Sequence, residues 1–232
     1  MNAGTLGLYH LSQRPRTTPA AGEHPPLLIL LHGVGSHEGD LFGLAPYLDP
    51  RFHILSLRAP YTLGPGSYAW FEVQFPPQGP VIQPEQAEAS RKALVHFIEK
   101  VSAHYQADPR QVYLLGFSQG AILSLALTLT RPDLLAGVVA MSGRTVPELF
   151  SQDGPLAGHL APREQLENFP LMVVHGAQDQ VLPVRYGRDT RDRFAALPVK
   201  LTYKEYDMSH SVSEASLRDV AAWLAARLDK KA

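Results

Sequence analysis

Short apolar runs alternate along the chain with longer stretches in which apolar residues recur at helical spacing. The uninterrupted runs lie at 27–31, 112–115, 137–141 and 171–174. Such runs suit strands that are covered on both faces, as the strands of parallel sheets are. Strands that alternate with helices therefore predict an α/β protein with a mostly parallel, doubly wound sheet and helices on both faces.

Helical spacing predicts three helices, at 85–105, 119–130 and 213–228. Three further strands are expected at 5–11, 52–57 and 200–206. In the helix at 85–105, the charged side chains between the apolar positions are expected to form a solvated face: Glu88, Arg91, Lys92, Glu99 and Lys100.

Prolines mark the segments that are expected to lack regular structure. Residues 13–26 are expected to form a loop, and repeated prolines in 58–84 predict no regular element there. Trp70 and Phe71 lie in that second segment and are expected to supply an apolar wall for a substrate, with the alternative that Trp70 packs inward. Residues 144–170, also interrupted by prolines, leave room for a short helix or a flap.

The most informative stretch is Gly116-Phe117-Ser118-Gln119-Gly120, which joins an apolar run to the helix that begins at Gln119. A serine on such a sharp strand-to-helix turn is exposed, and glycines two positions before and after it let strand and helix pass closely. The pattern G-x-S-x-G alone occurs by chance in many proteins, so its flanks carry the interpretation. With them, Ser118 is the candidate nucleophile rather than part of a structural turn.

Two further residues complete a constellation for acyl transfer. Asp179 follows the strand expected at 171–174, and His210 follows the strand expected at 200–206. Because active residues gather beyond the carboxyl ends of parallel strands, both side chains are expected to share one edge of the sheet with Ser118. A serine nucleophile needs a base that takes its proton and an acid that orients the base, and we assign these roles to His210 and Asp179.

Other residues compete for these two roles. Asp207 is a rival acid close to His210 in sequence, whereas Asp189 and Asp192 are expected on a surface helix. His175 is the rival base. A base and its acid on one short turn would point apart more readily than meet, so His175 is expected to be structural.

The turn His32-Gly33-Val34-Gly35 follows the first apolar strand. A dinucleotide site would need a further glycine where the chain has Glu38, so no cofactor is expected. The turn is instead expected to expose a backbone N–H toward Ser118 and to form half of an oxyanion hole. No metal site is expected, since no cluster of carboxylates accompanies His32 and His37, which are expected to brace the loop.

Composition sets the frame for these elements. The 232 residues, 45% of them hydrophobic, predict a single domain over 1–232 in which residues 1–26 form an N-terminal strand and loop. The net charge of -1 offers no footprint for nucleic acid, and the chain has no cysteine for a disulfide or a thiolate site. No apolar run approaches the ~20 residues that span a bilayer, so no stable membrane insertion is expected. The start lacks the pattern of a signal peptide, which predicts a cytoplasmic protein.

Together these motifs resemble the carboxylesterase/phospholipase family of α/β-hydrolases, which includes acyl-protein thioesterases. The resemblance spans nearly the whole chain from about Leu27 and rests on residues 31–35, Ala69-Trp70-Phe71, the stretch 116–121, His175-Gly176 with Asp179, and His210. It implies an α/β-hydrolase fold without a cap domain or cofactor, and an enzyme that cleaves small-molecule carboxylic esters or thioesters. It also implies that the backbone N–H groups of Val34 and Gln119 form the oxyanion hole.

Three interpretations stay open. The first is a serine hydrolase that cleaves esters of short to medium acyl chains, and the second is a lysophospholipase or acyl-protein thioesterase. The third, a non-catalytic hydrolase-like binding protein, ranks last because no member of the Ser–Asp–His set is missing. Relatives with thioesterase activity usually carry an aspartate where this chain has Ser36, and the chain reaches Asp40 only later. The sequence leaves the oligomeric state open, a homodimer included.

Overall fold

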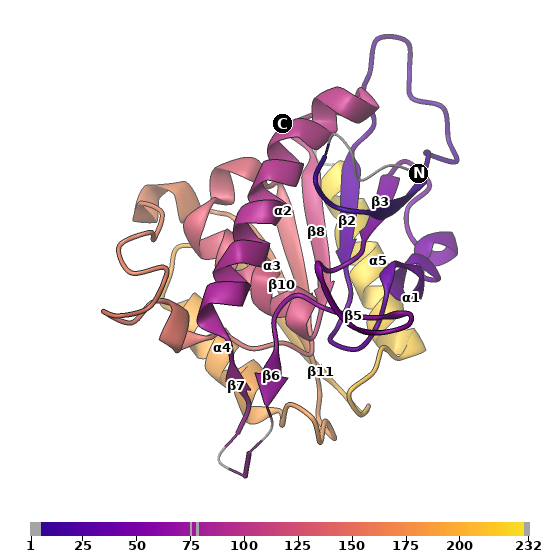
Figure 1. The fold of residues 1–232 in the computed structure, drawn as a ribbon. Coiled ribbons are helices and arrows are strands. Elements are labelled where there is room, and N and C mark those ends of the chain that lie inside the picture. Colours follow the sequence, from indigo (N-terminus) through magenta and orange to yellow (C-terminus); the bar gives the residue numbers. More distant parts are fainter. Residues whose placement is uncertain (1–5, 75, 78, 230–232) are drawn as a thin grey trace.

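A seven-stranded sheet with the strand order β1-β3-β2-β8-β9-β10-β11 forms the centre of the molecule (Figure 1). The computed structural model describes residues 6–74, 76, 77 and 79–229. In this sheet β1 pairs antiparallel with β3, and every other neighbouring pair is parallel. The strands are β1 (His10–Gln13), β2 (Leu27–Leu31), β3 (His53–Leu57), β8 (Val112–Phe117), β9 (Gly137–Met141), β10 (Pro170–Gly176) and β11 (Lys200–Tyr206). The mostly parallel sheet of an α/β-hydrolase fold is confirmed.

Helices cover both faces of the sheet (Figure 1). They are α1 (Glu38–Phe42), α2 (Pro84–Tyr105), α3 (Gln119–Thr130), α4 (Arg185–Ala195) and α5 (Glu214–Leu228). The apolar side chains of α2, α3 and α4 pack in one core cluster with Leu27, Ile29 and Leu31 of β2. Those of α1 and α5 pack in a second cluster with Leu28 and Leu30. Alternate residues of β2 therefore enter opposite cores, which explains its continuous apolar run.

Local sequence signals fix the ends of the helices. Nearly all of α3 is buried, which accounts for its apolar sequence. The Ser213 hydroxyl accepts a hydrogen bond from the Ser216 N–H, and Ser216 Oγ accepts one from the Ser213 N–H, so the two residues cap the start of α5. Pro84 begins α2, and the helix ends at Tyr105, because the next residue, Gln106, has a left-handed φ of 52°.

Several expected elements match the structure, but the N-terminal strand is displaced. The strands at 27–31, 137–141 and 200–206 and the helix at 119–130 have the expected bounds. The strand expected at 5–11 is wrong in position, since the paired strand is His10–Gln13 and Thr5 lies outside the described residues. The apolar residues before the strand, Leu6 and Leu8, are buried in the core without pairing.

The segment 58–84 contradicts the prediction of no regular element. It forms two short antiparallel hairpins: β4 (Tyr61–Gly64) with β5 (Ser67–Ala69), and β6 (Val73–Gln74) with β7 (Val81–Ile82). Its prolines all lie outside these strands, and Pro65 stands in the turn between β4 and β5. The prolines therefore lie in the connections between these short strands and do not exclude the strands themselves.

The solvated face expected on α2 is also partly wrong. Glu88 and Arg91 are 7% and 8% exposed and form an ion pair in which Arg91 Nε lies 2.6 Å from Glu88 Oε2. Arg91 also donates to the Thr130 hydroxyl at the end of α3. The pair is buried because α2 lies against α3 there, and the two charges are tolerated because they satisfy each other.

The segment 144–170 contains two single 3₁₀ turns, Pro147–Leu149 and Arg163–Leu166. Leu149, Leu156 and Leu166 anchor it, since each is at most 3% exposed. These two turns agree with the expectation that the segment has room for only a short helix.

Candidate active site

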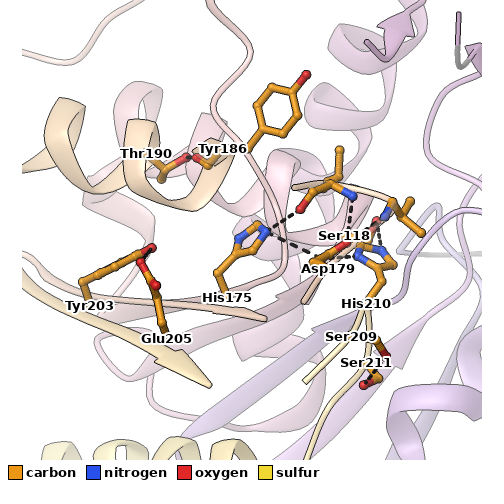
Figure 2. A network of polar contacts seen from close by, with 12 residues as sticks. Ser118, His175, Asp179, Tyr186, Thr190, Tyr203, Glu205, Ser209, His210 and Ser211 are labelled. Atoms are coloured by element: carbon orange, nitrogen blue, oxygen red, sulfur yellow. Dashed lines mark hydrogen bonds and ion pairs between the residues drawn. The ribbon is translucent and has the colours of Figure 1, made fainter. Parts of the chain in front are cut away.

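Three polar side chains from three different connections meet beyond the carboxyl ends of the parallel strands. Ser118 follows β8, Asp179 follows β10, and His210 lies between β11 and α5. His210 Nε2 lies 3.1 Å from Ser118 Oγ, and His210 Nδ1 lies 2.6 Å from Asp179 Oδ2 (Figure 2). The structure thus brings the three residues chosen from the sequence into one hydrogen-bonded chain.

Ser118 stands in a strained backbone conformation at the start of α3. Its φ is 53° and its ψ is -113°, and its N–H donates to the carbonyl of Met141 in β9. A Cβ on Gly116 would collide with the carbonyl of Gly120, and a Cβ on Gly120 would collide with the carbonyl of Leu31. Only glycine fits at both positions, so the two glycines let α3 approach β8 and β2 closely enough to form the turn.

Asp179 is buried and held as an anion. Its Oδ1 accepts hydrogen bonds from the N–H groups of Val181 and Leu182, at 2.9 and 2.8 Å, while Oδ2 accepts from His210. Burial works to raise the pKa of this carboxyl, but the hydrogen bonds from His210 and Leu182 outweigh burial, so the pKa is lowered from its usual value. An ionised Asp179 can therefore orient the imidazole and stabilise its protonated form.

The rival acids lie elsewhere. Asp207 is exposed and accepts a hydrogen bond from Gln178 at 2.5 Å. Asp189 and Asp192 are exposed on α4, where Asp192 pairs with Arg191. Among the described residues, Asp179 is the carboxylate that hydrogen-bonds to His210.

The expectation that His175 and Asp179 point apart is wrong. Its ring does not point away from the acid, because His175 Nε2 lies 3.6 Å from Asp179 Oδ2 (Figure 2). The side chain is 0% exposed, and its hydrogen bond runs to the Leu182 carbonyl, whereas Ser118 Oγ is bonded to His210. Buried behind the acid, His175 cannot serve as the base for Ser118.

The glycine-rich turn after β2 packs directly on the serine. A Cβ on Gly33 would lie 3.2 Å from the Cβ of Ser118, and Gly35 has a φ of +78°. The N–H groups of Val34 and Gln119, the two candidates for an oxyanion hole, have no hydrogen-bond partner in the described part of the chain. Two unsatisfied donors beside a serine are suited to an anionic oxygen.

Trp70 and Phe71 do not form an apolar wall for a substrate. Both side chains are 0% exposed and belong to the core between the sheet, α2 and α3. Trp70 Nε1–H donates to the carbonyl of His32 at 2.9 Å, which places the indole beneath the glycine-rich turn. The alternative, in which Trp70 packs inward and supports the loop, agrees with the structure.

The side chain of Gln119 makes contacts that the sequence did not reveal. Its side chain accepts a hydrogen bond from the Trp70 N–H at 3.0 Å and donates one to the Phe71 carbonyl at 2.7 Å. A glutamine at the start of a largely apolar, buried helix was the available signal, because a buried amide requires partners. The amide links the serine turn to the segment that supports the glycine-rich turn.

Of the two histidines expected to brace the glycine-rich loop, His32 does so, whereas His37 caps α1 instead. Burial lowers the pKa of His32, whose Nδ1–H donates to the Gly33 carbonyl and whose Nε2 accepts from the Ala59 N–H. His37 is exposed, caps α1 and accepts from the Gly39 N–H. No group of histidines and carboxylates in residues 6–74, 76, 77 and 79–229 is arranged to hold a metal ion. Within the same residues, no helix has both the length and the apolar character that crossing a membrane requires.

Residues 13–228 match the family described as Phospholipase/Carboxylesterase. The chain is 27% identical over 219 residues to acyl-protein thioesterase 1 of Kluyveromyces lactis, covering 87% of this chain and 92% of that one. Acyl-protein thioesterase 1 of Gibberella zeae is 24% identical over 234 residues, covering 94% and 97%. Among solved structures, the esterase PE8 superposes with a TM-score of 0.77 at 24% identity, covering 94% of this chain and 98% of that one. The Bacillus cereus carboxylesterase gives the same TM-score at 21% identity and covers 95% and 94%.

Proposed function

Since the chain belongs to the phospholipase/carboxylesterase family, we propose that it is a serine hydrolase that cleaves carboxylic esters of short to medium acyl chains. In this proposal Ser118 is the nucleophile, His210 the base and Asp179 the acid that orients the base. The observation that carries it is the hydrogen-bonded chain of the three residues, with 3.1 Å between Ser118 Oγ and His210 Nε2 and 2.6 Å between His210 Nδ1 and Asp179 Oδ2.

The reaction proceeds through an acyl-enzyme. His210 Nε2 takes the proton of Ser118 as its Oγ attacks the acyl carbon, and the negative oxygen that forms is bound by the N–H groups of Val34 and Gln119. His210 then gives the proton to the departing alcohol oxygen. His210 then takes a proton from water, which attacks the acyl carbon; the acid leaves as the acyl–Oγ bond breaks, and His210 returns the proton to Ser118 Oγ. The ionised Asp179 supports both steps by stabilising the imidazolium.

Exposed apolar side chains near the strand ends are candidates to meet the acyl chain. Leu63, Val81 and Val181 are 50%, 55% and 45% exposed, and they lie on the β4–β5 hairpin, on β7 and on the turn after Asp179. Each CH₂ that such a surface covers contributes about 0.8 kcal/mol. Hydrolysis rates should therefore climb with acyl length and level off where this surface ends.

A second candidate, acyl-protein thioesterase activity, is favoured by the names of the two curated relatives. The same serine chemistry would cleave a thioester, with a thiol in place of the alcohol as the leaving group. In this chain Ser36 donates a hydrogen bond to Asp40 at 2.6 Å beside the glycine-rich turn. A carboxylate therefore lies next to the turn although the residue after Gly35 is a serine.

Two measurements test these proposals together. A fluorophosphonate probe should label the wild-type chain once, on the peptide that contains Ser118, as read by mass spectrometry after digestion. A panel of p-nitrophenyl esters of increasing acyl length, run beside a palmitoylated peptide and a lysophospholipid, then ranks the substrate classes by kcat/KM. Labelling at another residue would overturn the assignment of Ser118, and a higher kcat/KM on the palmitoylated peptide would favour the thioesterase.

A further inference from the structure

His175 contacts the same carboxylate as His210, from the buried side. His175 is the residue before the last of β10, and its Nε2–H donates to the carbonyl of Leu182 at 2.8 Å while Nε2 lies 3.6 Å from Asp179 Oδ2 (Figure 2). Because the hydrogen is on Nε2, the neutral ring has its lone pair on Nδ1, and this atom has no partner among the described residues. All polar contacts of His175 therefore run through Nε2, toward the acid and its turn.

Leu182 connects the turn that carries Asp179 to His175, because both its backbone N–H and its carbonyl are hydrogen-bonded. The Leu182 N–H donates to Asp179 Oδ1, and the Leu182 carbonyl accepts from His175. The carboxylate is thus tied to its own turn, and the turn is tied through His175 to β10. A rotation of the carboxylate away from His210 would have to break one of these bonds.

Helix α4 fixes the ring from its other side. A Cβ on Gly187 would lie 2.7 Å from both Cγ and Nδ1 of His175, closer than side-chain atoms approach one another. Gly187 is buried and helical, where alanine would otherwise be the better residue. The glycine therefore serves the close contact between α4 and the ring. Burial also lowers the pKa of His175, so the ring enters this contact neutral.

We propose that His175 is a positioning residue for the reaction: wedged between Gly187 and the turn at Leu182, it holds the Asp179 carboxylate in the orientation that accepts the hydrogen bond from His210. The inference rests on the proposed roles of Asp179 and His210. Loss of this support would leave the three residues present but misaligned, and misplacement of a catalytic group by about 1 Å costs on the order of 10²-fold in rate.

The test compares two substitutions at His175 with a matched control. His175→Leu removes the donor to Leu182, whereas the amide of His175→Gln can supply an N–H at nearly the same place. The control is His53→Leu, because His53 is also a buried histidine, 4% exposed, and its contact with Ser12 lies on another strand. We expect His175→Leu to lower kcat about 10- to 100-fold with KM within about twofold, and His175→Gln to recover most of kcat. His53→Leu should lower the melting temperature and leave kcat within about twofold.

A second approach reaches the ring without altering it. Gly187→Ala adds one methyl group against His175 and should lower kcat with KM nearly unchanged, although alanine favours the helix. This variant and His175→Gln carry the test if His175→Leu fails to fold. Wild-type kcat in a folded His175→Leu or in Gly187→Ala would overturn the proposal, as would equal losses of kcat in the leucine and glutamine variants.

A proton NMR spectrum separates this inference from the proposed reaction. The His210 Nδ1–H that donates to Asp179 should give a far-downfield resonance, which can be followed in a Ser118→Ala background where no turnover is needed. We expect His175→Leu to shift or broaden this resonance and His53→Leu to leave it in place. An unchanged resonance in His175→Leu would overturn the positioning role. Esterase activity that survives Ser118→Ala would instead overturn the proposed function.

Discussion

Two regions meet at the sheet edge that carries Ser118, Asp179 and His210, and different kinds of contact determine the geometry of each region. We call the turns that carry Ser118, Asp179 and His210 the strand-end framework. Its geometry depends largely on the backbone: Ser118 has a positive φ, Gly116 and Gly120 leave no room for a Cβ, and backbone N–H groups bind the Asp179 carboxylate. The covering segments, 58–84 and 144–170, are two hairpins and two 3₁₀ turns, and side-chain contacts hold them. We therefore expect changes in the framework to alter the chemistry, and changes in the covering segments to alter which substrates fit.

The largest expected effect comes from replacing Ser118, the proposed nucleophile. Ser118→Ala should lower kcat by ~10⁴-fold or more, because the variant lacks the oxygen that attacks the acyl carbon. The fold should survive, because the Ser118 N–H and carbonyl keep their backbone hydrogen bonds to Met141 and Ile122. Ester hydrolysis and the melting temperature are measured on the same preparation. Activity within tenfold of wild type would rule out Ser118 as the nucleophile.

The next effect separates the acid from its neighbour in sequence. Asp179→Asn should lower kcat by about 10³- to 10⁴-fold, because an amide cannot stabilise the imidazolium and favours the wrong tautomer of His210. Asp207→Asn is the matched control and should stay within about threefold of wild type, since Asp207 is exposed and bonds to Gln178. The assignment of the acid would be reversed if Asp207→Asn proved the more severe substitution in the same kinetic assay.

The framework was predictable from sequence because its requirements are local. Apolar runs marked β2, β8, β9 and β10, and residues that follow parallel strands share one edge by topology, so Ser118, Asp179 and His210 could be grouped without coordinates. The covering segments depend on contacts that no periodicity records. The prolines of 58–84 could be read as breakers or as turn residues, and the inward direction of Trp70 depends on the His32 carbonyl and on Gln119. The contact of His175 with Asp179 could not be predicted either, because it depends on the direction of a side chain that no sequence periodicity records.

Trp70 joins the two regions, and truncating it sharpens the distinction between a wall and a brace. Trp70→Ala should lower the free energy of unfolding by about 3–5 kcal/mol, because a fully buried indole leaves a cavity and an unpaired His32 carbonyl. Turnover should fall as the glycine-rich turn loosens, but the preference among acyl chain lengths should not change. Loss of that preference at an unchanged melting temperature would instead show that Trp70 contacts the acyl chain of the substrate.

Arg144 tests the covering segments by themselves. Its side chain is 7% exposed, and Nη2 donates to the Pro80 carbonyl at 3.2 Å and to Glu148 Oε1 at 3.1 Å, which ties the two segments together. Arg144→Met should raise KM for longer acyl esters several-fold with kcat within about threefold, since the framework is untouched. Arg218→Met, at an exposed arginine that pairs with Glu214 on α5, is the control and should change neither constant. A fall in kcat without a change in KM would show that Arg144 acts on the framework.

The smallest expected effect is the loss of stability at low pH. We expect this loss to arise in the sheet, at His53 of β3, rather than in the covering segments. Burial lowers the pKa of His53 in β3 to about 4, helped by the nearby charges of Arg14 and His10. An unfolded histidine titrates near ~6.5, so the unfolded chain takes up this proton first, and stability that is complete above that pH is lost progressively as the pH falls toward 4. Between pH 7 and pH 5 this group should remove on the order of 1 kcal/mol from the free energy of unfolding. In His53→Gln the amide can keep the contact with Ser12 Oγ and does not titrate, so urea unfolding of this variant should show a smaller loss over that range. Parallel losses in the two proteins would mean that His53 is not the group through which acid weakens the sheet.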